Sequence, residues 1–443
     1  MNIQLSEHFT YRKLLRFTFP SMVMMVFTSI YGVVDGVFVS NFVGAGSFAA
    51  VNLIMPFLMV LGAVGFMLGT GGSALVSFTL GTGNVKKANE IFSFLIYVLM
   101  AAGAVFTVGG IAFLEPMSRF LGADEELLPV CVQYGRIVLT ALIPFMLQNT
   151  FQSFLVTAER PHFGLYITIA AGVANMGLDA LFIAGFRWGV SGAALATAVS
   201  QWIGGVIPLL YFALPNQSKL RLCRAKPDLR ALARAAANGS SEFMTNISMS
   251  IVTMLYNWQL MRLMGSDGVA VFGIIMYVNF IFLSIFLGYS LGSAPIVSYH
   301  YGAGNEPELK GLLQKSLRVI ACMSVALTAA AIALARPLAM IFVSYDPALL
   351  TTAVRAFSIY SVSFLLSGYN IYASSFFTAL NNGAVSALIS FARTLIFEVS
   401  AVLILPLFFK IDGVWGAVIA AELLALILSA ACLIRGRKKY GYA

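Results

Sequence analysis

The sequence predicts an all-α integral membrane protein with twelve transmembrane helices in two parallel six-helix repeats. Three observations predict this fold class. The 443-residue chain is 60% hydrophobic and only 10% charged, with a mean hydropathy of +0.89, whereas a soluble protein is about one quarter charged. Its apolar residues gather into twelve long runs. Short motifs of the first half also recur in the second half.

Each apolar run is long enough to cross a bilayer as a helix, which takes about 20 residues. Helices are expected because the bilayer core offers no water, so that backbone groups must bond within their own segment. Spanning strands would be runs of about 10 residues with alternating polarity, and the runs here are longer and uniformly apolar. The predicted spans are 14–39, 48–79, 91–114, 130–157, 163–186, 190–213, 235–261, 269–299, 316–343, 349–379, 384–409 and 414–434.

Basic residues predict the orientation of these spans. With a cytoplasmic amino terminus, the inside segments hold 19 Lys and Arg residues and the outside segments hold 5. Membrane proteins show this bias toward positive cytoplasmic loops. We therefore expect a multi-pass protein of a bacterial-type plasma membrane, with both termini and the basic segment 214–234 in the cytoplasm. Trp188, Trp258 and Trp415 are predicted to lie at the outer membrane interface.

Two repeated motifs divide the chain into halves. The stretch Gly81-Thr82-Gly83-Asn84 recurs as Gly302-Ala303-Gly304-Asn305, and Gly189–Ala193 recurs as Gly413–Ala417. The glycines are reasonable helix C-caps. Each half holds an even number of spans, so both halves start on the same membrane side and the repeats are parallel. The prediction is therefore a six-helix lobe 1–213, a cytoplasmic linker 214–234 and a six-helix lobe 235–443, with a substrate cleft between the lobes.

Several chemistries are missing from the sequence. No GxxxxGK motif occurs, so the chain carries no P-loop for ATP. The four cysteines are scattered and the three histidines do not cluster, which argues against a disulfide framework or a zinc site. We expect no cofactor. The net charge of +9 is explained by the cytoplasmic loops, and we expect no nucleic-acid partner.

Five carboxylates lie within predicted spans: Asp35, Asp179, Glu242, Glu398 and Glu422. A charge at the bilayer centre costs about 2.5–3.5 kcal/mol on insertion scales. Such a residue is by default expected to face the bundle interior or a water-filled cavity and to have a function. The alternative is a structural ion pair with an intramembrane arginine.

Arg393 is the only arginine predicted deep in a span, because Arg136 and Arg355 lie near outer ends where they can reach the interface. The expected partner of Arg393 is Glu398 or Glu422. Glu398 and Glu422 could therefore each serve either as the ion-pair partner of Arg393 or as part of a functional site.

Asp35 and Asp179 are predicted to share a site. Asp35 lies about one turn, and Asp179 and Thr197 about two turns, from the outer ends of their spans. Asn175 precedes Asp179 by four residues and therefore lies on the same helix face. Carboxylate, amide and hydroxyl oxygens can replace water around a hard cation such as Na⁺. Partly desolvated carboxylates can instead carry protons.

These residues also carry a family resemblance. Phe19-Pro20, the stretch Val34-Asp35-Gly36-Val37-Phe38-Val39, and the following Gly44, Ala49–Val51 and Pro56 resemble the opening signature of the multidrug and toxic compound extrusion (MATE) transporters. The resemblance covers nearly the whole chain.

The other matches to this family fall in register along the chain. Asn175, Asp179 and Thr197, together with Asp35, match its amino-lobe cation site in type and spacing. Pro20 matches a proline of the first helix whose bend has been linked to coupling. Glu242 matches a carboxylate that some members use in the carboxy-terminal lobe.

The resemblance implies a secondary antiporter that acts as a monomer. Inward movement of H⁺ or Na⁺ would drive export of organic, often cationic, compounds. Asp35, Asn175, Asp179 and Thr197 would hold the H⁺ or Na⁺, and Pro20 would act as a hinge. Glu242 and Glu398 are candidates for a substrate or proton site in the second lobe, although Glu398 and Glu422 lack a clear counterpart in the family.

Three alternatives compete with this prediction. A lipid-linked oligosaccharide flippase of the same superfamily should have a more cationic cavity for its pyrophosphate cargo. A membrane-embedded prenyl or acyl transferase should show paired Asp-rich or His-centred loop motifs, and none is visible. A channel would need no coupling site, and an assay of gradient-driven flux separates it from an antiporter.

Overall fold

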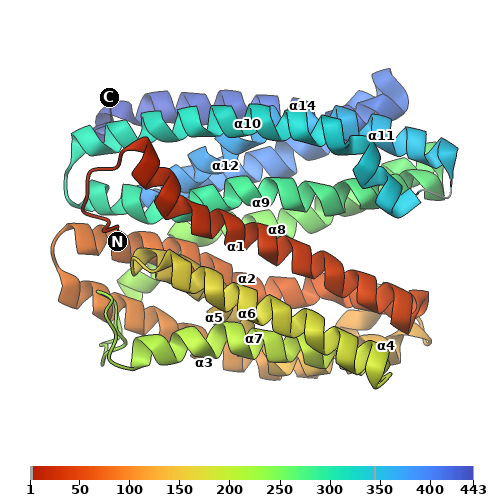
Figure 1. Cartoon of the computed structure of the whole chain (residues 1–443), viewed down its shortest axis with the longest axis horizontal. Helices are drawn as coiled ribbons and strands as arrows, with labels where there is room; N and C mark the ends of the chain where they lie inside the picture. Colours follow the sequence, from red (N-terminus) through yellow and green to blue (C-terminus); the bar gives the residue numbers. More distant parts are fainter. Residues whose placement is uncertain (1–2, 344–345, 443) are drawn as a thin grey trace.

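The computed structural model describes residues 3–343 and 346–442, except for the side chains at positions 40, 41, 45, 266 and 342. All regular elements of this part of the chain are helices, which run side by side along the long axis of the molecule (Figure 1). They are α1 (Tyr11–Phe38), η1 (Val39–Val43), α2 (Ala45–Gly81), α3 (Val85–Phe120), α4 (Leu127–Thr140), α5 (Leu142–Thr157), α6 (Pro161–Asp179), η2 (Ala180–Gly185), α7 (Gly189–Ala213), α8 (Leu229–Met264), α9 (Ser266–Gly302), α10 (Glu306–Val343), α11 (Pro347–Ser361), α12 (Phe364–Ala379), α13 (Gly383–Phe391), η3 (Ala392–Phe397) and α14 (Glu398–Tyr440), where η marks a π-helical segment.

The twelve predicted spans are confirmed, although the boundaries of the helices do not always match those of the spans. Eight segments of the described chain are long and apolar enough to cross a membrane. Two more spans are bent pairs, α4 with α5 and α11 with α12. A further span is α8, which has 36 residues and is therefore about 54 Å long. The last span arises because the segment 383–440 folds back on itself.

The reversal within α14 lies at Lys410, whose φ of 51° and ψ of −127° are not helical. Asn382, which precedes α13, donates a hydrogen bond to the hydroxyl of Tyr440 at the other end of the segment, with an N–O distance of 2.5 Å. Because the two ends of this segment meet, its halves are antiparallel and each crosses the bundle once.

The bend of 57° between α4 and α5 has a local cause. Pro144 lies in the first turn of α5 and has no N–H to donate to the carbonyl of Thr140. The helix therefore ends at Thr140 and starts again at Leu142. The bend of 46° between α11 and α12 has no proline at the break.

The repeated glycine motifs end two helices, as predicted. Gly83 and Gly304 follow α2 and α9 with positive φ values of 82° and 66°, which glycine adopts without strain. The next helix then starts at once, and Asn84 caps α3 by accepting a hydrogen bond from the amide of Lys87. These two tight turns lie at the end of the bundle that also carries both chain termini and the segment 214–228, which we call the terminal end (Figure 1).

Close helix contacts between the two halves of the chain lie toward the terminal end. A Cβ added to Gly239 of α8 would stand 1.9 Å from the carbonyl oxygen of Met67 in α2. A Cβ on Gly302 of α9 would stand 2.1 Å from the carbonyl oxygen of Phe78, also in α2. Glycine is therefore required where α2 crosses α8 and α9. Further along, Gly288 of α9 lies against Met22 of α1 in the same way.

Buried apolar side chains form two clusters. The first lies within residues 39–235. The second combines residues 252–442 with Val156 and with Leu5, Phe9, Leu14 and Phe17 near the amino terminus. This packing agrees with two lobes, and the predicted division at 213 and 235 stays a prediction. The first turn of α8 begins at Leu229, inside the predicted linker.

The prediction for one tryptophan is wrong. Trp188 and Trp258 are about half exposed, but Trp415 is buried. Trp415 packs inside the second cluster, since the backbone reversal at Lys410 turns the start of the last span inward. It therefore does not contribute to an interfacial aromatic belt.

Candidate functional site

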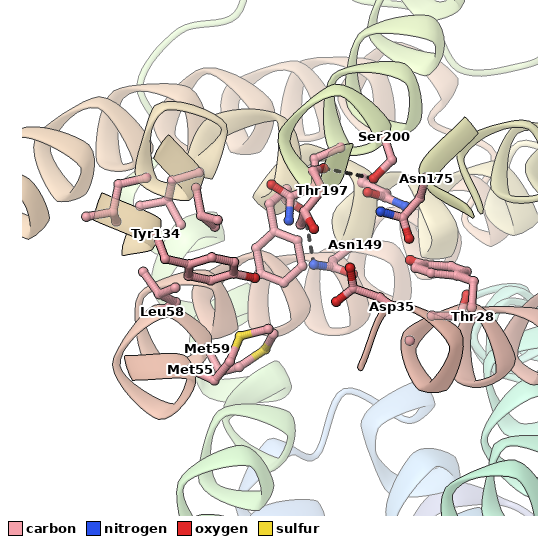
Figure 2. Close-up of a pocket in the computed structure, with 18 of the residues that line it drawn as sticks. Thr28, Asp35, Met55, Leu58, Met59, Tyr134, Asn149, Asn175, Thr197 and Ser200 are labelled. Carbon is pink, nitrogen blue, oxygen red and sulfur yellow. Dashed lines mark hydrogen bonds between the residues drawn. The ribbon is translucent and has the colours of Figure 1, made fainter. Parts of the chain in front are cut away.

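A cavity of about 280 Å³ lies within the first half of the chain, near the predicted cation site. Asp35 of α1, Asn175 of α6 and Thr197 of α7 all line it and point toward one another (Figure 2). Its wall also includes methionine and aromatic side chains such as Met55, Met59 and Phe66, hence the space is mostly apolar with a polar side. Asp35 is the single charged residue among the lining residues.

Asp179 lies behind this polar side. Its side chain is fully buried and does not line the cavity. The carboxyl groups of Asp35 and Asp179 are nevertheless close enough to interact electrostatically. The structure thus brings the two predicted acids together, one open to the cavity and one enclosed.

Several buried acceptor oxygens around this pair have no hydrogen-bond donor within the described residues. They are Oδ1 of Asp35, Oδ1 of Asn175, both carboxylate oxygens of Asp179, Oγ1 of Thr197 and Oε1 of Gln201. A buried polar atom without a partner is costly, and such atoms in a native structure call for a proton, a water or an ion. A set made only of carboxylate, amide and hydroxyl oxygens fits a proton or a hard monovalent cation.

The backbone beside these acids is irregular. The π-helical segment η1 begins four residues after Asp35, and η2 begins directly after Asp179. The third such segment, η3, contains Arg393 and ends directly before Glu398. A π-helical turn inside an α-helix is rare and occurs frequently at functional sites. All three adjoin residues that carry charge within a span.

Sequence reasoning missed the neutral polar residues of this cavity. Tyr134, Gln148, Asn149 and Gln201 line it with the predicted residues. Asn149 donates its side-chain amide to the carbonyl of Phe145, 3.0 Å away. A neutral amide costs less to insert than a charge and therefore gave no functional signal in the sequence.

A second, smaller cavity of about 130 Å³ lies in the second half of the chain. Arg393, Glu398 and Glu422 line it. The guanidinium of Arg393 donates to Oε1 of Glu422 through Nη2 and Nε at 2.6 and 2.9 Å. Ser367 and Asn370 add hydrogen bonds to the same carboxylate. Glu422 is therefore the partner of Arg393 in a satisfied structural network.

Glu398 lines the same cavity but makes no ion pair with an arginine of the described residues, because Arg393 is paired with Glu422. Glu242 is half-buried in α8 and does not line this cavity. The structure therefore does not place Glu242 beside Glu398 in the second cavity. Pro20 lies inside an unbroken α1, between Thr18 and Met22, which contact α9 at Gly292 and Gly288.

A sequence comparison identifies relatives over the whole length of the chain. The sequence model of the MatE family matches residues 20–181 and 243–403. The multidrug export protein MepA of Staphylococcus haemolyticus (strain JCSC1435) is 25% identical over 429 residues, which cover 95% of this chain and 93% of the relative. MepA of Staphylococcus aureus (strain NCTC 8325 / PS 47) is 24% identical over 419 residues, covering 94% and 92%.

Solved structures share the fold. The outward-facing conformation of a multidrug resistance MATE family transporter of the MOP superfamily superposes with a TM-score of 0.92 at 22% identity, covering 99% of this chain and 98% of that one. A MOP superfamily transporter from Pyrococcus furiosus Vc1 (DSM3638), described as having a binding pocket of reverse polarity, superposes with a TM-score of 0.90 at 21% identity, covering 98% and 96%.

Proposed function

Because this chain belongs to the MatE family of membrane transporters, which are not enzymes, we propose that it exports small organic compounds in exchange for H⁺ or Na⁺. The relatives named MepA are multidrug export proteins, and the same cargo class is proposed here. The observation that carries the coupling proposal is a pair of neighbouring acids, Asp35 and Asp179, whose buried oxygens have no donor among the described residues and which lie beside a mostly apolar cavity.

The cavity chemistry supports cationic, lipophilic cargo. Methionine and aromatic walls adapt to different apolar shapes, and an aromatic face attracts an organic cation. Asp35 supplies a negative charge on the polar side, with no Lys, Arg or His among the lining residues. Cargo that carries a positive charge would therefore be attracted to the same carboxylate as the coupling ion.

Competition for Asp35 and Asp179 then couples the two fluxes. A proton or Na⁺ bound between these acids neutralises the carboxylate charge that cationic cargo needs, so uptake of the ion favours release of the cargo. Net export requires only that the ion and the cargo differ in affinity between the outward- and inward-open states. Asn175 and Thr197 would provide neutral oxygen ligands to the ion.

The same cavity argues against a flippase of lipid-linked oligosaccharides. Such cargo carries a pyrophosphate, which needs basic side chains. The basic residue of the second cavity, Arg393, is already neutralised by Glu422. Neither of these two cavities therefore carries a net positive charge, and organic cations remain the better match.

We further propose that the terminal end is cytoplasmic. It carries both chain termini and the segment 214–228 (Figure 1), and many Lys and Arg residues lie in these segments, among them Lys219, Lys226 and Arg437. Positive loops stay in the cytoplasm. The protein would then release cargo at the opposite end of the bundle.

The decisive experiment measures export from proteoliposomes with Na⁺ and pH gradients imposed separately. The gradient that drives export in the wild type identifies the coupling ion. Asp35→Asn and Asp179→Asn should each abolish gradient-driven export while the proteins stay folded, because an amide keeps the shape and loses the titratable charge. Thr197→Ala should weaken export less, since the hydroxyl is a neutral ligand.

Asp267→Asn is the matched control, because Asp267 is exposed in the first turn of α9. It should transport as the wild type does. Export by both Asp35→Asn and Asp179→Asn with the wild-type dependence on pH and Na⁺ would show that these acids do not couple. Glu398, with Glu242, would then be the next candidate.

A further inference from the structure

Two ionic contacts at the terminal end join the two halves of the chain. In the first, Nζ of Lys87 in α3 lies 2.8 Å from Oδ2 of Asp228, the residue that precedes α8. In the second, Glu308 of α10 accepts a hydrogen bond from the amide of Phe9 at 2.9 Å and pairs with the ring of His8. We call these contacts clasp 1 (Lys87–Asp228) and clasp 2 (Glu308 with His8 and Phe9).

The clasps occupy equivalent places in the two halves. Lys87 and Glu308 lie in the first turns of α3 and α10, and they are 221 residues apart, as are Gly81 and Gly302. Each contacts the residues just before the first long helix of the other half, α8 or α1. The charges are reversed, however. Clasp 1 has its base on α3, whereas clasp 2 has its acid on α10.

Clasp 2 is reinforced by packing. Phe9 is fully buried and Glu308 is 6% exposed. Lys315, two turns along α10, donates its ammonium to the carbonyl of Phe9 at 2.6 Å, and Phe9 also meets the ring of His300 edge-on. The backbone amide and the backbone carbonyl of Phe9 thus both bind to the second half of the chain and fix the segment before α1 there.

Both clasps lie next to the closest helix crossings. Clasp 1 follows the end of α2, where Gly81 lies against the carbonyl of Tyr299. Clasp 2 follows the end of α9, where Gly302 lies against Phe78. Opening the molecule at this end would separate these crossings and stretch both contacts.

We propose that clasps 1 and 2 form a paired latch that holds the terminal end closed, with Lys87 and Glu308 as its positioning residues. Each must release for the molecule to open at that end. This inference goes beyond ion and cargo binding, because it assigns a conformational role to residues far from either cavity.

The clasps differ in expected strength. The side chains of Lys87 and Asp228 are 44% and 29% exposed, and exposed ion pairs are weak. Removing clasp 1 should therefore raise the ratio of open to closed molecules about two- to fivefold. Removing the buried Glu308 should raise it about tenfold or more, because hydrogen bonds to charged groups are stronger.

The test measures distances between spin labels at Lys86→Cys and Lys310→Cys, two exposed positions on opposite halves, in a background without the four native cysteines. The samples are full-length protein in nanodiscs without cargo. Asp228→Asn removes the charge and keeps a good N-cap for α8, while Glu308→Ala removes clasp 2. Each should increase the long-distance population, and the double variant should increase it further.

Matched controls separate a latch from general stability. Asp346→Asn changes another helix-capping aspartate, which accepts hydrogen bonds from two backbone amides and pairs with no lysine of the described residues. Glu306→Ala changes an exposed acid in the same first turn as Glu308. Both should leave the distances unchanged.

The proposal is overturned if Asp228→Asn shows the wild-type distances, whatever its thermal stability. The proposal is also overturned if Glu308→Ala folds and shows the wild-type distances. If Glu308→Ala does not fold, Asp228→Asn alone decides. Because the distances are measured without cargo or gradients, the outcome does not depend on the coupling role of Asp35 and Asp179.

Discussion

At the scale of single residues, the membrane-embedded charges divide into two kinds. Glu422 receives hydrogen bonds from Arg393, Ser367 and Asn370, so its charge is satisfied within the protein. Asp179 has two buried oxygens without a donor. Both residues cost free energy to insert into a membrane. The hydrogen bonds of Glu422 offset this cost, whereas the oxygens of Asp179 remain available to a proton or an ion.

Removing the partner of a buried charge should destabilise the protein. Glu422→Gln and Arg393→Ala should each lower the free energy of unfolding by about 3–5 kcal/mol, because the remaining charge is left buried and unpaired. Thermal unfolding in detergent measures this effect. Glu398→Gln is the comparison, and a loss as large as that of Glu422→Gln would contradict the structural assignment. The ion dependence of export should change little in any Arg393→Ala protein that folds.

Asp228 gives a prediction for pH. The Lys87 ammonium, and then the amide of Ala231, hold the pKa of Asp228 below its usual value. A lowered pKa in the folded protein means that folding favours the ionised form. The stabilisation is therefore complete above the unfolded-state pKa of about 3.9 and is lost as the pH falls through the lower folded-state value.

Asp228→Asn should therefore be less stable than the wild type by about 0.5 kcal/mol near neutral pH. The difference should stay constant from about pH 7 to pH 5 and shrink only in stronger acid. Thermal unfolding of both proteins across this range measures it. A difference that grows as the pH falls would contradict the ion pair with Lys87.

The candidate site could be predicted from sequence where it carries charge or matches the family pattern. Asp35, Asp179 and Arg393 were found because a charge within an apolar run is rare. Thr197 and Asn175 followed from spacing and family pattern. Tyr134 and Gln201, by contrast, are residues that many membrane helices carry, and only the folded helices bring them to the cavity. The fully buried position of Asp179 likewise depends on packing that no pattern of one helix encodes.

At the scale of elements, apolar run length predicted the twelve spans well, because the bilayer imposes one length on all of them. The runs could not show the break at Ala141, since Pro144 is compatible with either a kink or a first turn. They also could not show η1, η2 and η3. A π-helical turn inserts one extra residue into a turn without changing the apolar composition.

The glycine at the crossing of α2 and α8 should be sensitive to substitution. Gly239→Ala places a methyl group 1.9 Å from the carbonyl oxygen of Met67, so the helices must separate. We expect a loss of about 1–3 kcal/mol in stability, measured by thermal unfolding. Gly109→Ala is the control, because a Cβ there meets no atom within 4 Å. Equal stability of the two variants would show that this crossing adapts at no cost.

At the scale of the whole molecule, the orientation can be tested by labelling single cysteines in intact cells. The basic asymmetry predicts that Lys226→Cys, in the exposed segment before α8, is shielded from an impermeant thiol reagent. Glu126→Cys, exposed at the opposite end of the bundle, should react. The background lacks the native cysteines. Labelling of Lys226→Cys from outside would reverse the proposed orientation.

The repeat in the sequence predicted two halves, and two buried clusters are present. The repeat could not predict that the amino-terminal residues pack with the second cluster. Phe9 lies outside the repeated motifs, and its partners Glu308 and Lys315 are about 300 residues away in the chain. Only the assembled structure brings such distant residues together.

This long-range packing has a consequence for biosynthesis. The contact between Phe9 and Glu308 joins a segment that is synthesised before every transmembrane helix of the described residues to a residue made 299 positions later. Contacts of such large sequence separation form late. The segment that holds Leu5 and Phe9 must therefore remain without its partners in the second cluster while the helices up to α10 are synthesised. A nascent chain arrested before residue 308 would present that uncovered segment to chaperones and proteases, and its protection would mark the moment when the second half has folded.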